Sequence, residues 1–87
     1  FYNDLMVLRA PIHLMKKEYT ELVDLLFDLI PKQRQVYRII ELEYYLAVAY
    51  EAQGKKEDAI AVLEFVTKRD LKLDQVSKGH ALLEKLN

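Results

Sequence analysis

Two histidines and two pairs of carboxylates are the side chains of this 87-residue sequence that have the potential for metal binding or acid–base chemistry. His13 and His80 are single histidines on partly apolar segments, where packing or solvation explains them better than metal ligation does. Examples of paired acidic residues are Glu41 with Glu43 and Asp24 with Asp28. Because they lie among basic residues, we interpret them as exposed helix faces rather than as general acid–base pairs.

The motifs that usually carry catalysis or cofactor binding do not occur in the sequence. There is no glycine-rich phosphate loop, no histidine pair at metalloprotease spacing and no serine in a nucleophile motif. The sequence has no cysteine, which excludes disulfides and thiolate-bound metals and leaves the compartment open. We therefore predict no enzymatic activity, no cofactor and no metal site.

Charge and hydropathy exclude two further classes of protein. Lysines and arginines are spread among acidic residues and the net charge is −1, so we predict no nucleic-acid binding. No uninterrupted apolar run approaches ~20 residues, so we predict no membrane span. Hydrophobic residues make up 52% of the chain, which excludes intrinsic disorder. The protein is therefore expected to fold around an apolar core.

The composition predicts an all-α fold of about five helices. Only two glycines and two prolines interrupt the chain, and alternating apolar and polar residues, the pattern of strands, are scarce. At 87 residues, one domain spanning positions 1–87 is expected. The sequence opens on Phe1 rather than on methionine, so we expect a fragment of a longer protein.

The clearest element is a helical hairpin over residues 33–69 that turns at Gly54. Apolar residues recur at helical spacing on both sides of this glycine, through Leu42 and Leu46 before it and through Ala59 and Leu63 after it. Glycine suits the left-handed residue that closes a helix. The pattern therefore predicts two antiparallel helices, about 33–53 and 57–69.

This hairpin resembles a tetratricopeptide repeat. The residues that carry the resemblance are Leu46, Ala47, Tyr50, Gly54, Ala59 and Leu63. The resemblance implies a short superhelix of stacked antiparallel hairpins, in which Ala47 and Ala59 let two helices approach closely. Glu43 departs from the pattern, because it stands where the repeat usually has a bulky aromatic residue.

A first hairpin is predicted over residues 3–30. Pro11 lies inside its first helix, where we expect a kink, the alternative being two short helices. The second helix is apolar almost all round, so we expect it to lie between the first and third helices. Setting Leu22 against Ala59 makes the two hairpins repeat at 37 positions, against about 34 in the usual repeat, and we attribute the difference to an extended third helix.

A last helix is predicted over residues 74–86. It has its apolar residues, among them Val76, on one side, together with His80. It is interpreted as a capping helix, the alternative being the first half of a truncated third repeat.

The third helix offers the best candidate for a binding surface. Steps of about 100° per residue place one set of side chains opposite the apolar stripe; these are Tyr37, Glu41, Tyr44, Val48 and Glu51. A purely solvated face has no need of two tyrosines and a valine, and tyrosines are favoured at interfaces. The resemblance implies a groove for an extended peptide or a partner helix, lined by Glu41, Tyr44, Val48, Glu51 and Ala52. The alternative is that Tyr37 and Tyr44 pack against the first or last helix.

Two functions follow as hypotheses. The first is a protein–protein interaction module that binds a partner peptide or helix through the exposed face of the third helix. The second is self-association, in which the same apolar surface closes a homodimer or packs against another part of a larger protein. A sensory domain of a regulator is a more distant third.

Overall fold

The chain folds into a stack of helices in the computed structural model, which describes residues 2–68 and 74–86. Its elements are α1 (Tyr2–Met15), α2 (Tyr19–Leu29), the short 3₁₀ helix η1 (Ile30–Lys32), α3 (Val36–Ala52), α4 (Lys56–Thr67) and α5 (Asp74–Leu86). Within those ranges there is no strand, which confirms the all-α prediction with about five helices.

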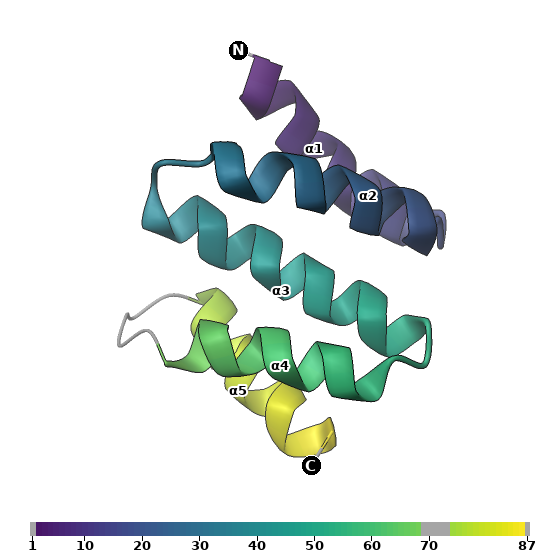
Figure 1. Ribbon diagram of the computed structural model, residues 1–87, viewed down its shortest axis with the longest axis vertical. Helices are drawn as coiled ribbons and strands as arrows, with labels where there is room; N and C mark the ends of the chain where they lie inside the picture. Colours follow the sequence, from purple (N-terminus) through teal and green to yellow (C-terminus); the bar gives the residue numbers. More distant parts are fainter. Residues whose placement is uncertain (1, 69–73, 87) are drawn as a thin grey trace.

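The helices stack in chain order, with α3 at the centre (Figure 1). From α1 to α4 the chain reverses direction at each connection, and successive helices pack side by side. α3 also contacts α1 and α5, so four helices surround it. The predicted place of α2 between α1 and α3 is confirmed, although α1 reaches α3 as well. The whole stack measures 36 × 27 × 18 Å.

Both helical hairpins close with the same turn. At the end of α3, Gly54 has a φ of 77°, and the Lys55 N–H donates to the Tyr50 carbonyl over 2.8 Å. At the end of α1, Lys17 has a φ of 60°, and the Glu18 N–H donates to the His13 carbonyl over 2.9 Å. This pair of features is the Schellman motif, in which a left-handed residue lets the chain satisfy the last helical carbonyls.

The burial pattern repeats at the same spacing as the turns. Lys17 and Gly54 lie 37 positions apart, as do four pairs of side chains that are 0% exposed; these are Ala10 and Ala47, Leu22 and Ala59, Leu26 and Leu63, and Leu29 and Val66. Equivalent positions in the two hairpins therefore face the core, and the register predicted from Leu22 and Ala59 agrees with the packing.

The predicted boundary and length of the third helix are wrong. α3 begins at Val36 rather than at position 33 or 34, and its 17 residues span about 26 Å at 1.5 Å per residue, against about 30 Å expected. Gln33 and Gln35 have extended backbones, with ψ of 140° and 125°. η1 and an extended segment thus precede α3, which at 17 residues is still longer than the 14-residue α1. The attribution of the 37-residue spacing to an extended third helix stays a prediction.

The helix that contains Pro11 is continuous. α1 runs from Tyr2 to Met15 with Pro11 inside it, so the alternative of two short helices is wrong. The kink at Pro11 stays a prediction. Proline removes one backbone hydrogen bond from α1, and the packing of α1 on α2 and α3 can offset that local cost.

Candidate protein-binding surfaces on the third helix

The five residues of the sequence-predicted face differ in exposure. Tyr37 is 48% exposed, whereas Glu41, Tyr44, Val48 and Glu51 are half-buried. α3 contacts α1, α2, α4 and α5, and of these four side chains Tyr44 packs against a buried cluster. The face is therefore a partly covered strip that ends in an exposed tyrosine.

Tyr44 belongs to the packed part of this strip. It lies against a buried cluster formed by Ala47, Ala59, Leu63 and Leu86, which come from α3, α4 and α5. Its ring is tilted by 52° relative to the ring of Tyr45, with 6.4 Å between their centroids. For Tyr44, the structure favours the alternative to a binding role, because its side chain packs against a cluster to which the last helix contributes Leu86.

Tyr37 keeps the features of a binding residue. Its ring is exposed at the beginning of α3, and the Arg38 guanidinium lies 6.0 Å from the ring centroid. A cation near the face of an aromatic ring is weakly attracted to it, so this contact slightly favours the observed position of the Tyr37 ring.

Tyr45 adjoins this strip but packs against another buried cluster, which includes Ala10, Leu22 and Leu42. Burial raises the pKa of Tyr45, and the negative charge of Glu41 and the neighbouring Tyr44 raise it further. Both effects disfavour the phenolate, so the Tyr45 hydroxyl stays protonated at neutral pH and can donate a hydrogen bond.

A second surface lies on the other side of α3, where the sequence did not predict a site. It is a cavity of about 190 Å³ that opens to solvent, lined by Phe27, Ile30, Pro31, Glu43, Leu46, Val62 and Phe65. These residues come from α2, η1, α3 and α4. The cavity thus lies where the two hairpins meet, and only the packing of one hairpin on the other brings its walls together.

Two aromatic side chains on the walls of this cavity are largely open to solvent. Phe27 is 57% exposed and Phe65 is 63% exposed. The Lys68 ammonium lies 5.9 Å from the centroid of the Phe65 ring. Both phenylalanines stand outside the buried stripes of α2 and α4, next to charged residues such as Asp28 and Glu64. That isolation was the one signal in the sequence that could have indicated the cavity.

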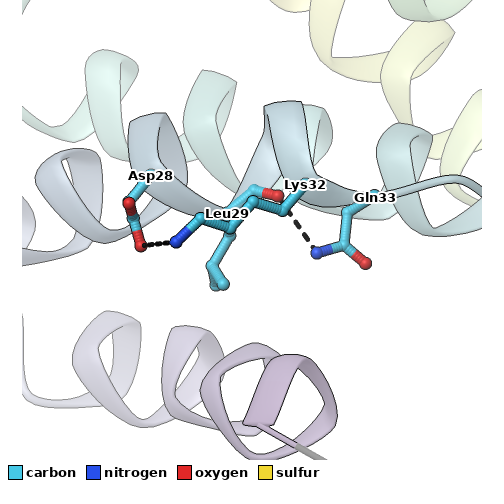
Figure 2. Close-up of polar contacts among 4 residues, drawn as sticks. All are labelled: Asp28, Leu29, Lys32 and Gln33. Atoms are coloured by element: carbon cyan, nitrogen blue, oxygen red, sulfur yellow. Dashed lines mark hydrogen bonds and ion pairs between the residues drawn. The ribbon is translucent and has the colours of Figure 1, made fainter.

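Side-chain contacts hold the η1 wall of the cavity in place. In Figure 2 the Lys32 Nζ donates to Asp28 Oδ2 over 3.1 Å, and the Gln33 Nε2 donates to the Leu29 carbonyl over 3.0 Å. The second bond satisfies one of the last carbonyls of α2. Both contacts join residues before Ile30 and Pro31 to residues after them. They therefore restrict the segment that carries these two lining residues.

The carboxylate pairs differ from their predicted exposure. Asp24 and Asp28 are exposed, as expected, but Glu41 and Glu43 are half-buried. The prediction was wrong for the second pair because α3 is covered from several directions. Glu41 acts on Tyr45, whereas Glu43 lines the cavity, so the two carboxylates do not share a site.

The histidines have structural surroundings. The Nδ1 atom of His13 lies 3.1 Å from Oε1 of Glu18, across the turn between α1 and α2. His80 is exposed on α5, so its expected place on the apolar side of that helix is wrong. In the described part of the chain, no three histidine or acidic side chains come together in a way that could hold a metal ion.

The described helices include none with the length and apolar character needed to cross a membrane.

Comparison with protein-family models, with curated proteins and with solved structures finds no match to this chain. Function must therefore be inferred from the two surfaces of α3.

Proposed function

We propose that this chain is a protein–protein interaction module, a tetratricopeptide-like scaffold that binds a peptide or helix of a partner protein. The observation that carries the proposal is the open apolar cavity between the two hairpins, with Phe27 and Phe65 exposed on its walls. Large aromatic side chains are enriched at the centres of protein interfaces, where burying them supplies much of the binding free energy. We assign no catalytic role to the described residues.

The volume of the cavity favours side chains over a metabolite. Pockets that enclose small-molecule ligands usually measure about 300 to 1,000 Å³. A cavity of about 190 Å³ accommodates one or two apolar side chains instead. The occupant that fits is therefore an apolar anchor on a longer segment, whose remaining residues lie across Phe27 and Phe65.

The sequence-predicted face is the second surface of the same module. Tyr37 is exposed there, and Glu41, Val48 and Glu51 are partly accessible. We propose it as an accessory contact with a partner that spans the beginning of α3. The two surfaces can be separated by mutation because Tyr37 does not line the cavity.

A selection of peptides tests this function and does not require the partner to be identified first. The immobilised chain is used to select from a phage library of random 16-residue peptides, and the dissociation constants of the enriched peptides are measured by fluorescence anisotropy. We expect Phe65→Ser to weaken binding at least about tenfold, as at a hot spot. Ala61→Ser is the control, because Ala61 is exposed on the same helix and does not line the cavity.

The outcomes separate the two surfaces. If Tyr37→Ser weakens binding and Phe65→Ser does not, the face of α3 is the site and the cavity is not. If no peptide is enriched over an empty support, the interaction function is wrong.

Self-association is favoured by a different observation. Leu8, Ile12 and Met15 follow one another at helical spacing along α1 and are 63%, 49% and 82% exposed. They form an uncovered apolar stripe at one end of the stack. Light scattering over a series of concentrations tests this alternative: a dimer that Ile12→Glu converts to a monomer supports it, and a monomer at every concentration contradicts it.

A further inference from the structure

Two apolar surfaces of this chain are uncovered, and one is hollow where the other projects. The hollow one is the cavity between the two hairpins, with Phe27 and Phe65 exposed on its walls. The projecting one is the α1 stripe, formed by Leu8, Ile12 and Met15. Among the described residues, seven large apolar side chains are exposed, and five of them belong to these two surfaces. Placing the stripe on the cavity would therefore remove most of the exposed large apolar side chains from water.

We propose that the cavity binds the α1 stripe of a second copy of this chain, with Met15 as the side chain that enters it. The inference rests on the proposed function, because it names the partner helix that the cavity accepts. It differs from a homodimer closed by two stripes, since here two different surfaces meet.

The stripe has the spacing of a helix that binds in a groove. Helices of this kind anchor in apolar grooves through residues at positions i, i+3, i+4 and i+7. Leu8, Ile12 and Met15 stand at i, i+4 and i+7 of α1. The volume of the cavity calls for an apolar anchor on a longer segment, and α1 presents such anchors on a helix that is already formed.

Met15 is the anchor that best fits the cavity. It is the last residue of α1 and is 82% exposed, so its own chain leaves it almost uncovered. Its unbranched side chain adapts to irregular spaces, and its sulfur packs favourably against aromatic rings such as those of Phe27 and Phe65. Glu43 already has an interaction within the chain, and the other six lining residues are apolar, so the cavity favours an apolar side chain.

The stripe that fills the cavity has to come from another molecule. α1 forms one end of the stack (Figure 1), and none of the residues that line the cavity belongs to it. The stripe is exposed in the same chain whose cavity is open, so the chain does not fill its own cavity. Because the two surfaces share no residue, one copy can offer its stripe while its cavity accepts the stripe of another copy.

Charges beside the two surfaces favour the same pairing. Lys16 is exposed one turn after Ile12, since the Lys16 N–H donates to the Ile12 carbonyl over 3.0 Å. Asp24 is exposed on α2, three residues before Phe27 and therefore next to it on the helix surface. Opposite charges thus flank the two apolar surfaces and orient their encounter. Lys68 lies beside the α4 wall, so the basic end of the incoming α1 is expected to lie over the α2 wall.

Light scattering on two variants, alone and mixed, tests this pairing. Met15→Glu places a charge on the stripe and keeps the cavity, whereas Phe65→Glu places a charge on the cavity wall and keeps the stripe. We expect the parent chain to self-associate as its concentration rises, and each variant to do so at least about tenfold more weakly, as at a hot spot. At a concentration where each variant alone is a monomer, an equimolar mixture should form a complex with one copy of each. The intact stripe of one variant then occupies the intact cavity of the other.

The controls separate a lost contact from a lost fold. Met15 and Phe65 are both exposed, so neither variant should unfold, and thermal unfolding followed by circular dichroism verifies this. If one of them is unfolded, Ile12→Glu mixed with Phe27→Glu repeats the experiment on a second pair. Val36→Glu is the matched control, because Val36 is an exposed apolar residue that belongs to neither surface, and it should associate like the parent.

Four results would overturn the pairing. A parent chain that is a monomer at every concentration does not bind a second copy. A dimer that persists in Phe65→Glu alone does not use the cavity, and one that persists in Met15→Glu alone does not use the stripe. If the two folded variants stay monomeric when mixed, the stripe and the cavity do not meet.

The peptide library separates this inference from the function on which it rests. A chain that stays monomeric but enriches peptides whose binding Phe65→Ser weakens would contradict the second copy and leave the interaction function standing. A chain that neither self-associates nor enriches a peptide would overturn both.

Discussion

A β-carbon placed on Gly79 would lie 3.1 Å from Cγ1 of Val66, closer than carbon atoms normally approach. Gly79 is buried in α5, and Val66 is 0% exposed in α4. The same β-carbon would lie 3.7 Å from Leu63 and from Thr67, so one turn of α4 faces the glycine. The missing side chain lets α5 pack closely on α4, and this contact attaches the last helix to the stack.

Gly79→Ala tests that contact because the substitution has two opposite effects on the free energy of unfolding. Alanine favours a helix over glycine by about 1 kcal/mol, whereas overpacking a closed site costs about 1 to 3 kcal/mol. Since Val66 is fully buried and has little freedom to move, we expect a net loss of about 1 kcal/mol in the free energy of unfolding, measured with urea. Ser77→Ala is the control on the exposed side of α5 and should gain a few tenths of a kcal/mol. A gain of about 1 kcal/mol in Gly79→Ala would show that α5 is not held this close.

Lys17→Gly should stabilise the protein. Lys17 adopts a φ of 60° at the end of α1, a conformation that costs a residue with a β-carbon roughly 1 to 2 kcal/mol and costs glycine almost nothing. Part of this gain is lost because glycine makes the unfolded chain more flexible, so we expect a net increase of about 0.5 to 1 kcal/mol. Thermal and urea unfolding both measure it.

Lys16→Gly provides the comparison for that variant. Lys16 precedes the left-handed position and is equally exposed, so glycine there relieves no strain and should destabilise slightly. Equal effects of the two substitutions would mean that the turn at Lys17 does not require a left-handed residue.

The turns show how far the sequence predicts this fold. Gly54 indicates the end of a helix because glycine is the residue type that a left-handed position favours. Lysine carries no such signal, and only the spacing of 37 positions from Gly54 points to Lys17. The period of the apolar residues, which is a local property, predicted the helices themselves. It did not predict where α3 begins, because Gln33 and Gln35 have extended backbones in the segment between η1 and α3.

The binding surfaces were predicted less well, for a reason that concerns tertiary packing. Helical periodicity separates Tyr44 from the apolar stripe of α3, but it cannot indicate that α4 and α5 contribute to a cluster against which Tyr44 packs. The cavity has the same origin, because Phe27 and Phe65 come from different hairpins. Glu43 is a charged residue next to the buried Leu42 of α3, yet its place in the cavity depends on α2 and α4 as well as on α3.

Tyr44→Ala and Tyr37→Ala should separate the core from the exposed part of the predicted face. Because Tyr44 packs on the cluster around Leu63, truncating it should lower the free energy of unfolding by about 1 to 3 kcal/mol. Tyr37 is 48% exposed, so its truncation should change stability by no more than about 0.5 kcal/mol. Urea unfolding of both variants measures the difference. If Tyr44→Ala is as stable as the parent, Tyr44 is not a core residue and is again a candidate for partner binding.

Ala59→Leu probes the close packing of α3 on α4. Ala59 and Ala47 are both 0% exposed and belong to one buried cluster, where small side chains let the two helix backbones approach. Three additional carbon atoms have no room there, so we expect a loss of about 1 to 3 kcal/mol in the free energy of unfolding.

Ala61→Leu is the matched control for this substitution because it makes the same chemical change two residues later on α4, where the side chain is exposed. We expect it to alter stability by no more than about 0.5 kcal/mol, since leucine and alanine both favour the helix. Coincident urea unfolding curves for Ala59→Leu and the parent would mean that the two helices do not cross at Ala59. They would also contradict the register that pairs Ala59 with Leu22, since both positions are assigned to the core on the same 37-residue spacing.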